Sequence, residues 1–276
     1  MKSLLPIFLL CPLLHGELPM AGLVLDLDAM KGLTVVDGDK VTVWKNQVVG
    51  VAARDFIHRD EGRKVAGSGR PALRASVPAL NGKPSLVFRR QELVCMDEDF
   101  FDSLTTGKGH TWIAVMAVHR QQAGLKDVNS FFGNLRNGGK YEGVWGCVND
   151  DNTVWWGARN GRTFGRFDEN NPQLLGSMLV TDRFSIVAGR MAAGQGNVRL
   201  ELFVDATEPI ASRNFPVNPD ANPSRMTIGQ ERDAIEHPGH ESFDGEIARF
   251  LIWNRPLSDE DMRKITTLLK TEYFKP

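Results

Sequence analysis

Hydrophobic and polar residues alternate along most of the chain in short runs, a pattern that predicts β-strands. The runs lie at residues 23–27, 41–44, 84–88, 111–118, 141–148, 153–158, 183–188, 198–204, 225–228 and 246–253. Most are separated by segments rich in Gly, Asn, Asp or Pro, which favour turns. The run at 111–118 is apolar on both faces and is typical of a central strand. The pattern predicts an all-β, antiparallel domain.

One helix is predicted near the C-terminus, over residues 258–273. Ser258 and Asp261 have the spacing of a capping box, in which the hydroxyl accepts a backbone amide and the acid reaches back. Met262, Ile265, Leu268 and Leu269 then recur at helical spacing. We expect this apolar stripe to pack against the strands.

Residues 1–16 have the features of a secretory signal peptide. Lys2 supplies a positive charge, and residues 4–14 form an almost unbroken apolar run that is too short to span a bilayer. Cleavage is expected near Gly16, with Ala21 as the alternative, and a packed N-terminal element is the competing interpretation. We therefore expect one domain over residues 17–276, secreted to the extracellular space or the periplasm and not membrane-spanning.

The net charge limits the class of binding partner, and the cysteines leave the redox state open. The chain has 33 basic and 34 acidic residues and a net charge of -1, which excludes the basic footprint of a nucleic-acid-binding protein. Two cysteines, Cys95 and Cys147, follow the predicted leader. They could pair in an oxidising compartment or stay buried as free thiols, and both interpretations stay open.

The segment 243–260, with Phe243, Gly245 and Ile247 before a hydrophobic strand and Asn254-Arg255-Pro256-Leu257-Ser258 after it, resembles a known closing signature. It is similar to that of concanavalin A-like, laminin-G-like domains of bacterial secreted proteins. The resemblance extends over residues 22–274 and implies a two-sheet antiparallel jelly-roll sandwich with a short C-terminal helix. Residues 205–207 lack the usual turn glycine, so a longer loop is expected there. Relatives of this fold include lectins, adhesion modules, glycosidases and lyases, so the fold does not choose the function.

Aromatic residues on the hairpin at 141–156 give the hint of a ligand. Alternation places Trp156 with Val154 toward the core and turns Trp155 outward, where a sugar could stack on it. A loop at 164–171 could instead cover it. The candidate ligand-binding residues are Trp155, Trp145, Tyr141, Arg159 and Asn160.

The turn of that hairpin is a candidate metal site. Asn149, Asp150 and Asp151 offer the oxygen ligands that calcium prefers, and rim loops carry such sites in laminin-G-like relatives. The same residues are favoured in turns for their backbone hydrogen bonds, so calcium binding and turn formation are both possible explanations.

No paired carboxylates suited to glycoside hydrolysis are visible along one strand. Glu201 and Asp205 would lie about 13 Å apart, whereas the mechanism needs about 5 to 9.5 Å. We therefore expect a secreted, non-catalytic, lectin-like module that binds a glycan or a cell-surface polysaccharide, with calcium if the turn holds it. Two alternatives are a structural or adhesion domain that contacts a protein or cell-surface partner, and a polysaccharide-active glycosidase or lyase with a dispersed site.

Overall fold

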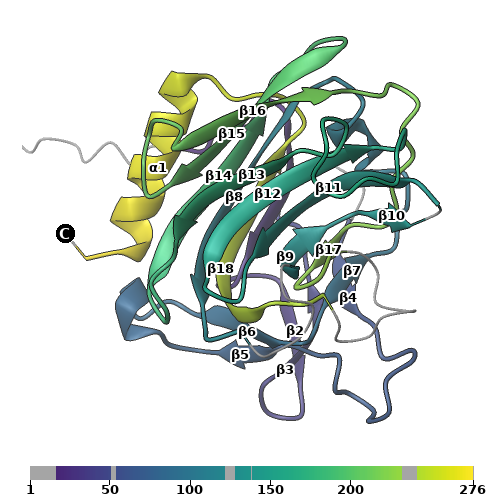
Figure 1. The fold of residues 1–276 in the computed structure, drawn as a ribbon. Helices are drawn as coiled ribbons and strands as arrows, with labels where there is room; N and C mark the ends of the chain where they lie inside the picture. Colours follow the sequence, from purple (N-terminus) through teal and green to yellow (C-terminus); the bar gives the residue numbers. More distant parts are fainter. Residues whose placement is uncertain (1–16, 51–53, 122–127, 138, 232–240, 276) are drawn as a thin grey trace, which may run out of the picture.

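The structure is a computed structural model of the 276-residue chain, and it describes residues 17–50, 54–121, 128–137, 139–231 and 241–275. Strands follow one another along the chain, separated by turns and loops, and one α-helix comes last (Figure 1). The strands are β1 (Leu23–Asp28), β2 (Leu33–Val36), β3 (Lys40–Trp44), β4 (Phe56–His58), β5 (Ala72–Arg74), β6 (Ser85–Arg89), β7 (Leu93–Cys95), β8 (His110–Val118), β9 (Asn129–Gly133), β10 (Arg136–Asn137), β11 (Tyr141–Val148), β12 (Thr153–Asn160), β13 (Gln173–Met178), β14 (Phe184–Met191), β15 (Asn197–Val204), β16 (Ala211–Pro216), β17 (Thr227–Ile228) and β18 (Asp244–Trp253). Two 3-10 turns, η1 (Pro78–Leu80) and η2 (Asp102–Leu104), and the helix α1 (Asp259–Tyr273) complete the set. The prediction of an all-β chain with one C-terminal helix is confirmed.

The strands form one continuous antiparallel sheet that folds over on itself around a core (Figure 1). One run of neighbours is β16, β15, β14, β8 and β18, and β18 also pairs with β1 and β6. The other run is β13, β12, β11, β9, β17, β7, β4, β3 and β2. Strand β5 pairs with both β6 and β3 and so joins the two runs.

The main core lies between the two runs and is built around Trp112 of β8. The Trp112 ring is stacked on Phe250, with centroids 6.4 Å apart, and meets Trp156 edge-on at 6.0 Å. Gly189 of β14 lies opposite this ring, and a Cβ there would come within 2.3 Å of Trp112 Nε1. The close approach of strand and indole therefore requires glycine at this position.

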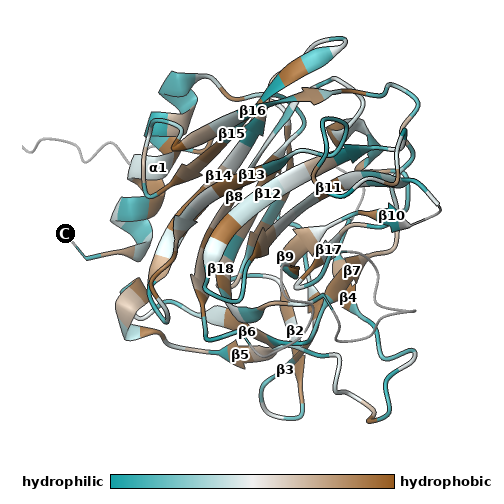
Figure 2. Cartoon of the chain, viewed as in Figure 1, coloured by the Kyte–Doolittle hydropathy of each residue, from teal (hydrophilic) through white to brown (hydrophobic). Residues whose placement is uncertain are grey.

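Helix α1 covers the outer face of the first run. Met262, Ile265, Leu269 and Tyr273 are buried there against residues of β8, β14 and β18. The backbone amide of Asp261 donates to Ser258 Oγ at 3.1 Å, so the predicted N-cap is confirmed. Figure 2 shows hydrophilic positions along the helix, as expected for an element with one exposed side.

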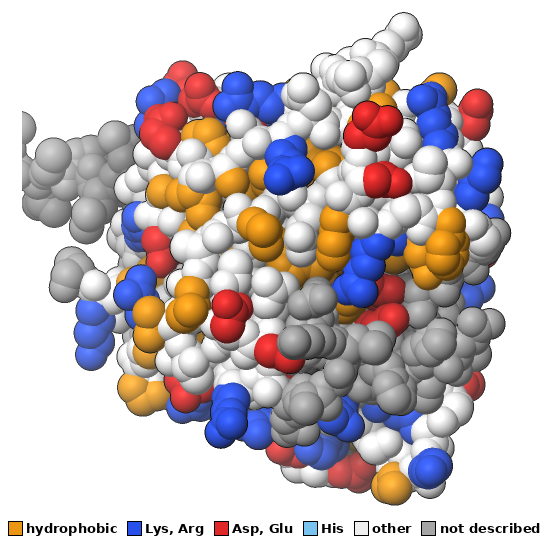
Figure 3. All heavy atoms as spheres, in the orientation of Figure 1, with side chains coloured by type: hydrophobic (Ala, Val, Ile, Leu, Met, Phe, Trp, Pro, Cys, Tyr) orange, Lys and Arg blue, Asp and Glu red, His pale blue; other side chains and the backbone are white. Residues whose placement is uncertain are grey.

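Among the described residues, no helix covers the outer face of the second run. Here β13 pairs with β12, and its Leu175 and Met178 are 48% and 64% exposed. Figure 3 shows hydrophobic side chains gathered on this side of the molecule. This face carries an aromatic cluster that includes Trp145 and Trp155.

The first described residues pack against the closing strand. Trp253 Nε1 donates to the Pro19 carbonyl at 2.7 Å, and Arg255 Nε donates to the Ala21 carbonyl at 2.7 Å. The predicted signal peptide, residues 1–16, lies outside the described residues. In the part of the chain that is described, no helix is long and apolar enough to cross a membrane.

Both cysteines that follow the predicted leader are buried free thiols. Burial raises the pKa of the Cys95 thiol to about 11, and it raises the pKa of Cys147 well above its usual value. Of the two interpretations of these cysteines, the structure therefore shows the unpaired one.

Candidate functional site

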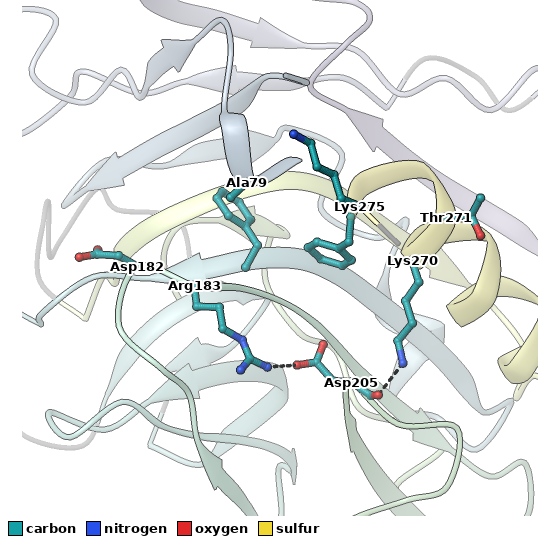
Figure 4. Close-up of a pocket in the computed structure, with 9 residues that line it drawn as sticks. Ala79, Asp182, Arg183, Asp205, Lys270, Thr271 and Lys275 are labelled. Atoms are coloured by element: carbon teal, nitrogen blue, oxygen red, sulfur yellow. Dashed lines mark hydrogen bonds and ion pairs between the residues drawn. The ribbon is translucent and has the colours of Figure 1, made fainter. Parts of the chain in front are cut away.

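A cavity of about 750 Å³ opens where the C-terminal end of α1 meets the turn before β14 (Figure 4). Its apolar lining comes from Phe184 of β14, from Phe274 just after the helix and from Ala79 of η1. Arg183, Lys270 and Lys275 add three basic groups, against two acidic ones, Asp182 and Asp205. The cavity thus combines aromatic rings with a basic rim.

Asp205 holds the rim together. Its Oδ2 accepts from Arg183 at 3.1 Å, its Oδ1 accepts from the Ile186 amide at 2.8 Å, and its carbonyl accepts from Lys270 Nζ at 2.8 Å (Figure 4). Asp205 starts the loop 205–210 between β15 and β16 with a left-handed φ of 51°, which agrees with the longer loop expected there. Both carboxylate oxygens are engaged, so we assign Asp205 a structural role. Arg183 is still 62% exposed and keeps donors for a ligand.

A chain of titratable side chains begins at the edge of the cavity. Asp182 is 70% exposed, and Figure 4 shows its carboxylate turned away from Asp205. Asp182 Oδ1 lies 2.5 Å from His119 Nδ1, and His119 Nε2 lies 3.5 Å from Glu246 Oε1. An imidazole held between two carboxylates can take up a proton on one nitrogen and release it from the other.

Glu246 is the buried end of this chain, with its side chain 4% exposed. Its Oε1 accepts from Arg74 at 2.8 Å, and its Oε2 accepts from Ser85 Oγ at 2.5 Å. These partners satisfy a charge that would be costly to bury alone.

The sequence interpretation missed this network because its members come from distant segments. His119 follows β8, Asp182 precedes β14, and 63 positions separate them. Glu246 reaches them only through the antiparallel pairing of β18 with β8. No local motif contains these residues, and a single sequence gives no signal for them.

The predicted ligand-binding aromatics lie together on the outer face of the second run. Trp156 belongs to the main core, whereas Trp155 and Trp145 lie on the opposite face, so the predicted alternation is confirmed. The predicted exposure of Trp155 is wrong, since Trp155 is 0% exposed. Phe167 packs edge-on against it at 5.4 Å. The covering loop considered as the alternative is what the structure shows.

Two other predicted residues frame this cluster. Arg159 is buried beside the rings of Tyr141 and Trp145, at 4.4 and 4.7 Å from their centroids. Asn160 is also buried, and its Nδ2 donates to Asn170 Oδ1 at 3.1 Å and to the Pro216 carbonyl at 2.9 Å. Asn160 therefore anchors the covering loop instead of facing a ligand.

The predicted calcium residues make turn interactions. Asp151 Oδ1 accepts from the Thr153 amide at 2.8 Å, and this hydrogen bond lowers the pKa of Asp151. Asp150 Oδ1 accepts from Asn129 Nδ2 at 3.2 Å. Among the described residues, no group of three or more His, Cys, Asp or Glu side chains is arranged to hold a metal ion. Asn149 closes the turn through its backbone, which bonds to Thr153 and Asn152 at 2.9 Å each. Asp151 thus serves the turn, whereas Asp150 ties the turn to β9.

Comparisons with known proteins identify related folds. No family model matches the chain, and neither does any curated protein. Trypanosoma rangeli sialidase in complex with sialic acid superimposes with a TM-score of 0.57 at 17% identity, covering 93% of this chain and 34% of that chain. The same sialidase in complex with 2,3-difluoro-KDN gives 0.55 at 16% identity, covering 91% and 33%. A mutant of it displaying trans-sialidase activity gives 0.54 at 17% identity, covering 93% and 34%. At this identity the similarity shows a shared fold, and the chain spans about a third of the length of these structures.

These neighbours correct the expected function. The sequence predicted a non-catalytic, lectin-like module that is not an enzyme. The structural neighbours contradict this prediction, because they are sialidases, which are glycoside hydrolases. The expectation rested on the distance between Glu201 and Asp205 along one strand. A distance along one strand cannot detect a site whose groups come from several segments, such as His119 and Glu246.

Proposed function

We propose that this chain takes part in the hydrolysis of glycosides whose sugar carries a carboxylate, and that the cavity between α1 and β14 holds that sugar. The observation that carries the proposal is the basic rim above aromatic rings. Sugar C–H faces pack on rings such as Phe184 and Phe274, while a guanidinium such as that of Arg183 binds a carboxylate through paired hydrogen bonds. The similarity in fold to sialidases supports this assignment.

In this proposal, Asp182 and His119 together transfer the proton. Glycoside hydrolysis needs groups that give a proton to the leaving oxygen and take one from water. Asp182 borders the cavity, and His119 connects it to the buried Glu246. The imidazole can hold the transferred proton between the two carboxylates.

The test is the release of methylumbelliferone from a fluorogenic sialoside by the full chain, with the corresponding galactoside as the neutral control. We expect cleavage of the sialoside alone. His119→Gln should lower kcat by about a hundredfold or more, because proton transfer by a positioned side chain contributes about that much. Arg183→Gln should mainly raise KM, and Arg213→Gln, which removes an exposed arginine from β16, should change neither. Failure to cleave the sialoside, or equal cleavage of both substrates, would contradict the proposal.

We further propose that the folded-over sheet is a jelly-roll sandwich of the concanavalin A-like, laminin-G-like type and that the chain is exported. The closing segment 243–260 and the apolar run at 4–14 support these two points. Mass spectrometry of the mature N-terminus tests whether the chain is exported and cleaved. The expected product is a protein that starts at Glu17.

A further inference from the structure

The outer face of β11 and β12 buries an arginine among aromatic rings. Arg159 is 5% exposed, and its guanidinium carbon lies 4.4 Å from the Tyr141 ring centroid and 4.7 Å from that of Trp145. Both contacts are within the range of cation–π attraction. The rings stabilise the charge but offer no acceptor for its N–H groups.

Two nitrogens of this guanidinium, Nε and Nη1, are buried and have no hydrogen-bond partner among the described residues. Arg249 is buried to a similar degree, at 8% exposed, yet its Nε and Nη2 each donate to a carboxylate oxygen of Asp26 at 3.0 Å. Buried donors are almost always paired, and charged ones most of all. Among the described residues, no carboxylate accepts from Arg159 as Asp26 accepts from Arg249.

The surroundings only partly offset the burial of this charge. Burial lowers the pKa of Arg159, and Arg166 adds to the lowering, whereas Glu231, Tyr141 and Cys147 act in the opposite direction. The pKa is lowered on balance, so burial outweighs these neighbours.

An exposed aromatic ring belongs to the loop that covers this region. Phe164 is 59% exposed and stacks on Tyr141 with centroids 4.6 Å apart. The rest of its loop is held firmly, since Asp168 Oδ1 accepts from the amides of Asn170 and Asn171 at 2.9 Å each. Displacing Phe164 would bury no polar group and would open the ring of Tyr141 beside Arg159.

We propose that the buried guanidinium of Arg159 is a binding site for a small carboxylate, which accepts a hydrogen bond from Nε or Nη1 and enters when Phe164 moves aside. The site lies on the outer face of the second run, whereas the cavity beside α1 lies on the first. It is therefore independent of the proposed hydrolysis. A free organic acid and the carboxylate of a sugar acid offer the same chemistry.

Tryptophan fluorescence tests the proposal, because Trp145 lies 4.7 Å from the Arg159 guanidinium and contacts Trp155, so its emission reports on that charge. The full chain is titrated with acetate and with N-acetylneuraminic acid, and with acetamide as the neutral match, at ionic strength held constant with chloride. We expect a saturable change with one or both acids and none with acetamide. Saturation at lower concentration with N-acetylneuraminic acid would identify a sugar acid as the ligand, and equal affinity would indicate a small organic acid.

Arg159→Gln should weaken this binding by about tenfold to a hundredfold, the range expected for charge-assisted hydrogen bonds. Arg159→Lys keeps the charge but removes Nε and Nη1, so it should also bind more weakly. It replaces the glutamine variant if that variant does not fold. Phe164→Ala should speed association, and Arg213→Gln should have no effect. A response to acetamide equal to that for acetate, no response to either acid, or unchanged binding in the Arg159 variants that fold would overturn the proposal.

Discussion

Acidification should destabilise the fold through His110, the first residue of β8. Its side chain is 0% exposed and lies edge-on to Trp156 at 5.6 Å. Nδ1 lies 2.8 Å from the Leu104 carbonyl, so Nδ1 carries the proton, and Nε2 is buried with no partner. Burial lowers the pKa of His110 to about 4, because a charged imidazole would have no compensating acceptor at Nε2.

The size of the effect follows from that pKa. An unfolded histidine titrates near 6.5, so above this pH both states are neutral and His110 has no effect. Between about pH 6.5 and about pH 4 the unfolded state binds a proton that the folded state excludes, and stability falls as the pH falls. The loss amounts to about 3 kcal/mol by pH 4 and does not grow below it.

Urea unfolding between about pH 7 and about pH 4.5 measures this loss. His110→Asn keeps a donor for the Leu104 carbonyl but cannot titrate. The variant should be less stable than the natural chain at neutral pH, because it leaves a small cavity. The difference between the two should shrink steadily as the pH falls. Carboxylates titrate in both proteins and cancel in this difference. Parallel pH profiles for the two proteins would refute the reasoning.

Three further substitutions probe the packing. Asp26→Asn should lower the free energy of unfolding by about 3 kcal/mol in urea, because it leaves the buried Arg249 without its paired carboxylate; a loss below about 1 kcal/mol would contradict this. Gly189→Ala should cost about 1 to 3 kcal/mol, measured as a lower Tm, since the added methyl would meet Trp112; an unchanged Tm would show that the indole can shift. Ser258→Ala should cost about 1 kcal/mol in urea through loss of the helix N-cap, and no change would mean that packing alone fixes the start of α1.

Local signals predicted the secondary structure well. The hairpin expected at 141–148 and 153–158 is observed as Tyr141–Val148 and Thr153–Asn160, because its turn residues and its alternation agree. The helix was predicted from Ser258 and an apolar stripe, both of which are local. The closure of the sheet depends on pairings such as β18 with β1, which join the two ends of the described chain and have no local signature.

The candidate sites were harder to predict because they depend on what covers the sheet. Alternation gave the correct face for Trp155, but its burial depends on Phe167, which arrives from a loop with no periodic pattern. The cavity beside α1 is lined by both Phe274 and Asp182, which lie 92 positions apart in the sequence. Side-chain direction can be read from one strand, whereas exposure needs the whole fold.

The two outer faces of the sheet explain why both sites contain arginine. Each face is apolar and needs a cover: α1 for the first run, and the loop that carries Phe167 for the second. At the margin of α1, Arg183 is exposed and bonded to Asp205, so it can bind a ligand without moving the helix. Beneath the loop, Arg159 is enclosed, and its Nε and Nη1 have no partner among the described residues, so a ligand there must first displace part of the cover. The first site should therefore bind rapidly and weakly, since water competes for its cation. Binding at the second should be slower, because it waits for Phe164 to move, and more selective for carboxylates, because a neutral ligand cannot satisfy the buried charge.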